Sequence, residues 1–193
     1  MPALGMEFVM SGDDVDSLPE SEAEVAIVGR SNVGKSSLVN ALSARKKLAH
    51  VSNTPGRTRL LNLFTVDGGG SIMDLPGYGY AKAPKHMRAQ WGAMIESYLL
   101  EREGLTMVMV LVDGEVGPTK LDLQMLDWLR ANGLPHTVIA TKHDKVKSSK
   151  RDKQKKIVAD KVDLEPRDIV WVSAHKGVGI DRLRGLILHW LEL

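Results

Sequence analysis

The sequence predicts an α/β fold in which helices flank both faces of a mostly parallel sheet. Short apolar runs typical of buried strands alternate along the chain with stretches whose apolar residues recur at helical spacing. Such alternation favours parallel strands joined by crossover helices. Ligands bind these sheets where the carboxyl ends of the strands meet. Each polar motif described below is predicted to lie at the carboxyl end of a strand. The functional site is therefore expected at that edge of the sheet.

Six strands are expected, at residues 24–28, 60–66, 71–73, 107–112, 138–140 and 169–172. The glycine-rich segment 67–70 separates two of them and indicates a tight hairpin, so one strand should run antiparallel to the others. About five helices should flank the sheet: one after residue 36, one around residues 91–99, one over 120–131 with Leu121, Met125, Leu126 and Leu129 inward, one from about residue 153 and one over 180–190.

Residues 1–21 are predicted to form an acidic leader, and residues 22–193 a single domain. The first 24 residues contain seven acidic residues and no Lys or Arg. Phe8-Val9-Met10 is a candidate edge strand, and residues 12–19 have the composition of a linker. The chain has no cysteine, no signal-peptide pattern and no apolar run long enough to cross a bilayer. A soluble cytoplasmic protein without disulfides or membrane contact is therefore expected.

Residues 29–36 read GRSNVGKS, which is the G-x-x-x-x-G-K-[ST] spacing of a phosphate-binding loop. They lie between a predicted strand and a predicted helix, as such a loop requires. Glycines let the backbone wrap around an anion, Lys35 can reach the outer phosphates, and the Ser36 hydroxyl can ligate Mg²⁺. A chance match is expected in on the order of one chain in a hundred of this length. Phosphate binding is therefore predicted for Gly29, Arg30, Ser31, Asn32, Val33, Gly34, Lys35, Ser36 and Ser37.

A second motif, Asp74-Leu75-Pro76-Gly77, follows the strand expected at residues 71–73. An isolated Asp-x-x-Gly is more often a turn than a site. When it follows a phosphate loop in the same domain, its carboxylate is suited to hold Mg²⁺ through water. The Gly77 N–H is then suited to donate to a terminal phosphate.

The segment Thr141-Lys142-His143-Asp144 also follows a predicted strand, and it indicates which base is bound. A carboxylate at Asp144 can accept hydrogen bonds from the ring N–H and the exocyclic amine of guanine, whereas adenine offers neither donor there. A buried carboxylate left unpaired is costly, so discrimination should be strong. The Lys142 stem can lie over the base plane, and Ser173-Ala174 can present a backbone N–H to the guanine carbonyl. Guanine recognition is therefore favoured over an exposed loop.

A basic run covers residues 142–161, with nine Lys or Arg against three Asp. Such a run is most often a solvated helix face. The alternative is a surface that tracks the phosphates of a nucleic acid. The sequence leaves both interpretations open.

These motifs, together with Thr54-Pro55-Gly56-Arg57-Thr58 and Tyr78-Gly79, resemble the EngB family of bacterial GTPases, also called YihA or YsxC, in the TrmE-Era-EngA-YihA-septin-like class. The similarity extends from about residue 22 to the end, and segments 24–40 and 76–81 are especially similar. The resemblance implies a Ras-like P-loop GTPase domain that converts GTP and water to GDP and phosphate. It also implies a role in assembling the large ribosomal subunit, with a subunit precursor or rRNA as partner, and a link to cell division and septation. We expect a monomer.

The resemblance assigns site residues by position. Ser36 and Thr58 would ligate Mg²⁺, Asp74 would do so through water, and Lys35, Thr58 and Gly77 would carry catalysis. Two switch regions would span residues 56–60 and 74–77. Beyond the phosphate loop, the nucleotide would contact Gly56, Arg57, Thr58, Arg59, Leu60, Asp74, Leu75, Pro76, Gly77, Thr141, Lys142, His143, Asp144, Ser173, Ala174 and His175.

Two positions depart from common GTPase patterns. Thr141 stands where Asn is usual, and a hydroxyl replaces only part of an amide's hydrogen bonding, so nucleotide affinity should be modest. Tyr78 stands where many GTPases carry the Gln that orients the attacking water, so intrinsic hydrolysis should be slow, or stimulated by K⁺ or by the ribosomal particle. Asn32 either helps to bind K⁺ or only tolerates an unusual backbone conformation. Arg30 is expected to face away from the phosphates.

Two functions are compatible with these features. The first is a GTPase whose switch regions are ordered by the γ-phosphate and Mg²⁺. The alternative is a GTP-gated module that binds RNA or the ribosome with little turnover of its own, which Tyr78 and the basic run favour. An ATPase is a more distant alternative.

Overall fold

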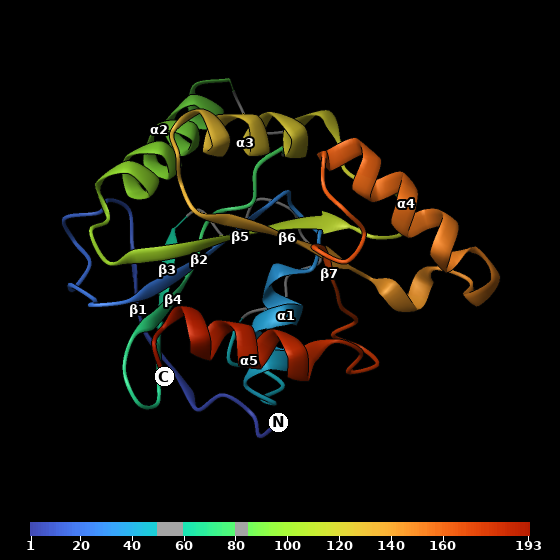
Figure 1. The fold of residues 1–193 in the computed structure, drawn as a ribbon. Coiled ribbons are helices and arrows are strands. Elements are labelled where there is room, and N and C mark those ends of the chain that lie inside the picture. Colours follow the sequence, from blue (N-terminus) through green and yellow to red (C-terminus); the bar gives the residue numbers. More distant parts are fainter. Residues whose placement is uncertain (50–59, 80–84) are drawn as a thin grey trace.

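A seven-stranded sheet forms the centre of the computed structural model, which describes residues 1–49, 60–79 and 85–193, with the side chains of residues 85–91 outside the description. The strands are β1 (Met6–Gly12), β2 (Glu24–Gly29), β3 (Leu61–Val66), β4 (Ser71–Asp74), β5 (Leu105–Asp113), β6 (His136–Thr141) and β7 (Val170–Trp171). Their order across the sheet is β1-β3-β4-β2-β5-β6-β7. The predicted mostly parallel α/β fold is confirmed (Figure 1).

Only β3 runs against the other described strands. It pairs antiparallel with β4, as the hairpin at residues 67–70 predicted, and antiparallel with β1 on its other side. The pairs β4–β2, β2–β5, β5–β6 and β6–β7 are all parallel. The sheet has one strand more than the six expected, because the candidate edge strand around Phe8 extends over the whole of β1 and joins the sheet.

The edge strand β1 lies within the predicted leader. Leu4 and Met6 are buried, and the Phe8 ring packs edge-on against Phe64 with 5.7 Å between the ring centroids. Leu18 is buried as well. The first residues of the chain therefore contribute apolar side chains to the core, while the domain boundary at residue 21 stays a prediction.

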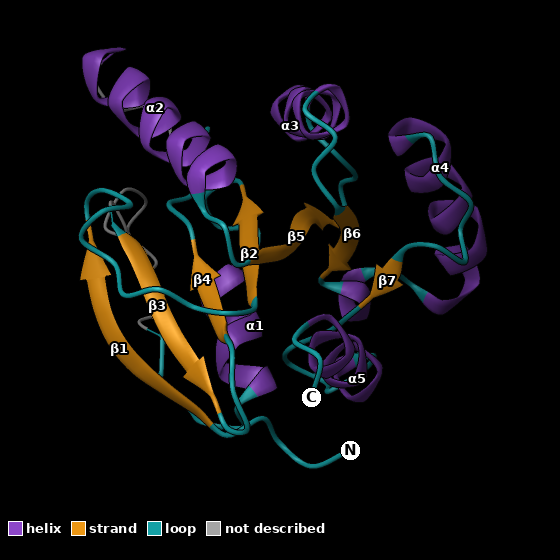
Figure 2. Cartoon of the chain, turned by 60° about the vertical axis from the view of Figure 1, so that its left-hand side comes forward, coloured by secondary structure: helices purple, strands orange, loops and turns teal. Residues whose placement is uncertain are grey.

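Five helices cover the sheet within the described parts of the chain: α1 (Lys35–Leu42), α2 (Lys85–Glu101), α3 (Lys120–Ala131), α4 (Arg151–Val162) and α5 (Ile180–Trp190). α1 and α5 lie on one face, and α2, α3 and α4 pack on the other (Figure 2). Successive side chains of a strand point to opposite faces, so Val25 and Ile27 of β2 contact the first layer while Ala26 and Val28 contact the second. None of these helices has the length and hydropathy needed to cross a bilayer.

Helix α3 has the predicted bounds but a different inward face at its start. Leu121, predicted to point inward, is 44% exposed, and Asp122 is buried instead. The cause is a capping box: the Thr119 N–H donates to Asp122 Oδ2 at 2.7 Å, and the Asp122 N–H donates to Thr119 Oγ1 at 3.4 Å. Asp122 thereby takes the inward position, and Leu126 and Leu129 follow it on the same face of the helix.

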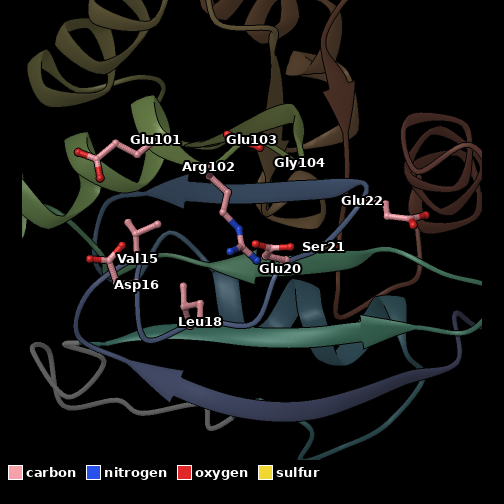
Figure 3. Close-up of a pocket in the computed structure, with 10 residues that line it drawn as sticks. All are labelled: Val15, Asp16, Leu18, Glu20, Ser21, Glu22, Glu101, Arg102, Glu103 and Gly104. Carbon is pink, nitrogen blue, oxygen red and sulfur yellow. The ribbon is translucent and has the colours of Figure 1, made fainter.

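A buried ion pair joins β2 to the end of α2 at the amino-terminal edge of the parallel strands. Arg102 Nε lies 2.8 Å from Glu24 Oε1, and the Tyr98 hydroxyl donates to the same oxygen at 2.5 Å. Beside this pair is a cavity of about 770 Å³ with an acid-rich lining that includes Asp16, Glu20, Glu22, Glu101 and Glu103 (Figure 3). Because Glu24 begins β2 and Gly29 ends it, this cavity lies at the edge opposite the predicted phosphate loop.

Candidate nucleotide-binding site

The predicted phosphate loop connects β2 to α1. Asn32 and Gly34 have positive φ angles of 65° and 112°, and Gly34 directly precedes Lys35, the first residue of α1. A Cβ on Gly29 would lie 2.9 Å from Val33 Cγ1, so the loop packs against itself only because residue 29 is glycine. The loop thus combines a tightly folded backbone with a helix N-terminus, the arrangement that proteins use for phosphate.

Lys35 and Asp74 are both buried, with exposed fractions of 9% and 3%. Burial lowers the pKa of Lys35, and the charge of Asp74 opposes that change. Burial also raises the pKa of Asp74 to about 6, against the opposing charge of Lys35. Asp74 Oδ1 has no hydrogen-bond partner among the described residues. The structure therefore holds a buried ammonium and a buried carboxylate in mutual attraction near the phosphate loop.

The segment after β4 runs alongside the phosphate loop. The Ser31 N–H donates to the Tyr78 carbonyl at 2.9 Å, and the Tyr78 N–H donates to the Gly29 carbonyl at 3.3 Å. A Cβ on Gly77 would lie 2.9 Å from Lys35 Nζ and 3.0 Å from the Ser31 backbone. Gly77 is thus held next to the Lys35 ammonium, where the sequence analysis expected an N–H for the terminal phosphate.

The Tyr78 side chain is bonded to helix α3. Its hydroxyl donates to Asp122 Oδ1 at 2.8 Å. Burial raises the pKa of Tyr78, and the charge and hydrogen bond of Asp122 raise it further. The phenol therefore stays neutral and is engaged in a structural contact.

Thr141 connects the predicted base-recognition segment, residues 141–144, to the phosphate loop through a hydrogen bond. It ends β6 and is 5% exposed, and its Oγ1 lies 2.7 Å from the Val33 carbonyl oxygen and 3.1 Å from that of Val112. The next residue, Lys142, has a left-handed φ of 56°, which turns the chain sharply at the strand end. These contacts bring the two segments together although they are far apart in the sequence.

The His143 side chain faces the core. It is 7% exposed and packs edge-on against Trp171, with 5.4 Å between the ring centroids. Burial lowers the pKa of His143, and the positive charges of Arg151 and Lys155 lower it further. The His143 N–H donates to the Val172 carbonyl at 3.0 Å. This residue therefore anchors the base-recognition segment to β7.

Asp144 and Ser173 meet from two neighbouring strand ends. The Ser173 hydroxyl donates to Asp144 Oδ1 at 2.6 Å, and this hydrogen bond is the main cause of a lowered pKa at Asp144. The Ser173 N–H already donates to the Val178 carbonyl at 2.9 Å. Of the predicted Ser173-Ala174 pair, Ala174 is therefore the residue suited to offer its N–H to a base carbonyl, with His175 exposed beyond it.

Asp113, the last residue of β5, belongs to the site although it was not predicted from the sequence. Its Oδ2 accepts hydrogen bonds from Lys142 Nζ at 2.7 Å and from Arg30 Nη2 at 3.1 Å. Burial alone would raise the pKa of Asp113, but the Lys142 bond and two backbone N–H groups outweigh it, so the pKa lies below its ordinary value. A signal was present, because Asp113 directly follows the predicted strand 107–112, as the motif carboxylates follow theirs.

Four predicted site residues, Gly56, Arg57, Thr58 and Arg59, lie outside the described residues. Leu60 precedes β3 and is 40% exposed. The remaining predicted site residues lie at or just after the carboxyl ends of β2, β4, β6 and β7. The phosphate loop donates a hydrogen bond to Tyr78 and accepts one from Thr141, and Ser173 donates to Asp144; these bonds join the four strand ends into one site.

A phosphate loop, a buried carboxylate at the end of the adjacent strand and a base-recognition segment that ends in Asp144 define a P-loop protein of the Ras-like GTPase class. Residues 24–142 match the family model described as 50S ribosome-binding GTPase. The chain is 45% identical over 195 residues to a probable GTP-binding protein EngB from Pelotomaculum thermopropionicum, an alignment that covers 100% of this chain and 98% of the relative. The corresponding protein from Geobacter sulfurreducens is 44% identical over 178 residues, covering 92% of this chain and 86% of the relative. The chain belongs to the EngB family of GTP-binding proteins, and it is a GTPase of this ribosome-associated family.

Solved structures support the fold. A crystal structure of a probable GTP-binding protein engB superposes with a TM-score of 0.72 at 24% identity, covering 88% of this chain and 99% of that chain. Aquifex aeolicus Era bound to GDP and AlF4⁻ superposes with a TM-score of 0.68 at 28% identity, covering 89% of this chain and 57% of Era. Era in complex with MgGDPNP and nucleotides 1506–1542 of 16S ribosomal RNA superposes with a TM-score of 0.68 at 26% identity. The superposition covers 90% of this chain and 58% of Era.

Proposed function

We propose that the chain is a guanine-nucleotide switch that hydrolyses GTP during assembly of the large ribosomal subunit, and that normal cell division and septation depend on it. The observation that carries the proposal is the buried pair Lys35 and Asp74, set between the phosphate loop and Gly77. A desolvated ammonium stabilises phosphate charge more strongly than an exposed one does. Lys35 would therefore bind the outer phosphates, and Gly77 would donate its N–H to the terminal phosphate.

Hydrogen bonds within the protein order the residues that are proposed to hold the base. The Ser173 hydroxyl keeps the Asp144 carboxylate ionised, because it stabilises the charged form. Asp144 would accept from the guanine ring N–H and amine, and Ala174 would donate to the guanine carbonyl. The Lys142 stem would lie over the base plane. This arrangement selects GTP and GDP over adenine nucleotides.

The site fits Mg²⁺, which prefers oxygen ligands. Asp74 Oδ1 is a buried carboxylate oxygen without a partner among the described residues, and the Ser36 hydroxyl lies in the first turn of α1. Ser36 and Thr58 would ligate the ion directly and Asp74 would do so through water, with Thr58 outside the described residues. When bound, the ion neutralises charge on the β- and γ-phosphates.

Intrinsic hydrolysis is proposed to be slow. The Tyr78 hydroxyl is engaged by Asp122, so the residue after Gly77 does not orient the attacking water in the way a Gln does. Stimulation would come from the ribosomal particle or from K⁺. Asn32 has a left-handed backbone, which agrees with the conformational role named above. In the alternative role, its side-chain amide would help to bind K⁺.

The partner is proposed to be a large-subunit precursor or its rRNA, with the chain acting as a cytoplasmic monomer. The matching family description names 50S ribosome binding, and Era carries a segment of 16S ribosomal RNA in its complex. The basic run of this chain begins inside the base-recognition segment and continues through the following turns into α4. Lys150, Lys153 and Lys156 are exposed there, which suits contact with RNA phosphates.

A second candidate is a GTP-gated RNA- or ribosome-binding module with little turnover. The hydrogen bond from Tyr78 to Asp122 favours it, because it engages the side chain directly after Gly77 in a structural contact. Phosphate release from GTP separates the two, measured with and without large-subunit precursors, in K⁺ and in Na⁺, with small-subunit particles as the control. The switch GTPase predicts that the precursors raise turnover by at least about tenfold, a small part of the roughly 10³–10⁵-fold that a charge-stabilising arginine supplies in other GTPases. Unchanged, near-zero turnover in all mixtures would favour the module.

A further inference from the structure

We propose that Asp113 is a positioning residue for guanine recognition, which fixes Lys142 over the base and couples it to Arg30 of the phosphate loop. The inference rests on the proposed function, because it concerns the same nucleotide site. Asp113 lies at the end of β5, between the strand that leads to the phosphate loop and the strand that leads to the base-recognition segment.

Within the described part of the chain, four hydrogen bonds hold the Asp113 carboxylate in one orientation. Its Oδ1 accepts from the N–H groups of Glu115 and Val116 at 3.0 and 3.2 Å. Its Oδ2 accepts from Lys142 Nζ and Arg30 Nη2. The side chain is 3% exposed, so its charge is screened little by solvent. A buried carboxylate with both oxygens engaged is a rigid anchor for the two cations.

The Lys142 stem must be ordered before it can lie over a base. Its side chain is 35% exposed, and a free lysine stem samples many rotamers. The 2.7 Å contact between Lys142 Nζ and Asp113 Oδ2 orders that stem before a base arrives. Because ordering the stem in advance lowers the entropy cost of binding, it raises affinity for the base.

Arg30 links the same carboxylate to the phosphate loop. Its guanidinium lies 3.1 Å from Asp113, and its backbone bridges to Tyr78 next to Gly77. Asp113 therefore offsets the positive charge of both Arg30 and Lys142 close to the phosphate site. Replacing Asp113 by a neutral residue should strengthen the general attraction for phosphate while it loosens the contact with the base. The two effects have opposite signs, which distinguishes positioning from a general structural role.

The test is Asp113→Asn, whose amide oxygen still accepts from Glu115 and Val116 but whose NH₂ group faces the two cations. Affinities for GDP and for inorganic tripolyphosphate are measured by displacement of a fluorescent GDP analogue. The variant should bind GDP about tenfold or more weakly, since a charged hydrogen bond is lost, and tripolyphosphate at least as tightly as the parent. Asp127→Asn is the matched control, because Asp127 is 75% exposed in its pair with Arg130 on α3 and should leave both affinities unchanged.

Lys142→Met tests the same contact from the other side, and thermal unfolding of each variant checks its folding. If Asp113 acts through Lys142, Asp113→Asn should weaken GDP binding far less when combined with Lys142→Met than it does in the parent. A parental GDP affinity in Asp113→Asn, an equal loss of GDP and tripolyphosphate, or full additivity of the two substitutions would overturn the inference. A parent protein that fails to bind GDP would instead overturn the proposed function. Should Asp113→Asn not fold, Lys142→Met alone must weaken GDP binding, and parental GDP affinity in it would also overturn the inference.

Discussion

Thr141 Oγ1 lies 2.7 Å from the carbonyl oxygen of Val33, and this hydrogen bond spans 108 residues of sequence. It joins the end of β6 to the middle of the phosphate loop. A change at the base-recognition segment can therefore alter the phosphate loop directly. The hydroxyl of Thr141, which stands where Asn is usual, therefore forms a hydrogen bond within the protein.

Thr141→Val should weaken GDP and GTP binding to the same extent. The change leaves the buried Val33 carbonyl without this donor, which typically costs about 1–3 kcal/mol of stability in the phosphate loop. The part of this cost that nucleotide binding must offset lowers the affinity for both nucleotides, by up to about a hundredfold. Titration of both nucleotides measures the effect. Thr137→Val, earlier on the same strand, serves as the control and should bind like the parent. Parental affinity in Thr141→Val would show that the loop does not depend on this bond.

Asp144→Asn should convert the base preference from guanine toward xanthine. The 2-oxo group of xanthine needs a donor where the guanine amine needs an acceptor, and an amide supplies one. Competition between GDP and xanthosine diphosphate reports the change. Ser173→Ala, which removes the hydroxyl that bonds Asp144 and accepts from the Lys176 N–H, should lower GDP affinity without reversing the preference. If Asp144→Asn binds GTP as tightly as the parent, another residue recognises the base.

The buried His143 should make the fold less stable as the pH falls. The pKa of His143 is lower in the folded protein, chiefly because the side chain is buried. Between that pKa and the unfolded pKa of about 6.5, the unfolded state binds more protons than the folded state. Stability therefore rises with pH through this window and is lost as the pH drops through it. Urea unfolding at pH 7.5 and 5.5 should show a smaller loss for His143→Gln than for the parent. His189→Gln, at an exposed histidine, should lose as much as the parent, and equal losses in all three proteins would contradict the argument.

The exposed lysines around α4 should make RNA binding sensitive to salt. Arg151 is set apart from them, because its Nε donates to the Val146 carbonyl at 3.2 Å. Replacing Lys150, Lys153 and Lys156 with Ala should reduce the salt slope of binding to large-subunit precursors by about 2, since each phosphate contact contributes roughly 0.7–0.9. GTP affinity should stay unchanged. Lys46→Ala with Lys47→Ala is the control, and a parental slope in the triple variant would make the run a solvated face.

The elements and motifs that the sequence predicted are those set by neighbouring residues. The apolar pattern of β2 and the spacing of Gly29, Gly34 and Lys35 are local, so they needed no knowledge of the fold. The inward position of Asp122 in place of Leu121 comes from a capping box with Thr119, a local signal that the apolar spacing of the helix does not include. The bond of Asp122 to Tyr78, in contrast, depends on a distant segment. The role of Asp113 likewise needs Arg30 and Lys142 to meet across the sheet. Contacts of that kind follow from strand order, which a single sequence does not display.

Lys35 and Asp144 are proposed to belong to one site that hydrolyses GTP. Phosphate release measured with equal concentrations of GTP or ATP, in Mg²⁺ and K⁺ with large-subunit precursors present, tests it most directly. The parent should release phosphate from GTP and almost none from ATP, and Lys35→Ala should abolish release, because the buried ammonium is the group proposed to bind the outer phosphates. Equal release from both nucleotides, or undiminished release by Lys35→Ala, would contradict the account.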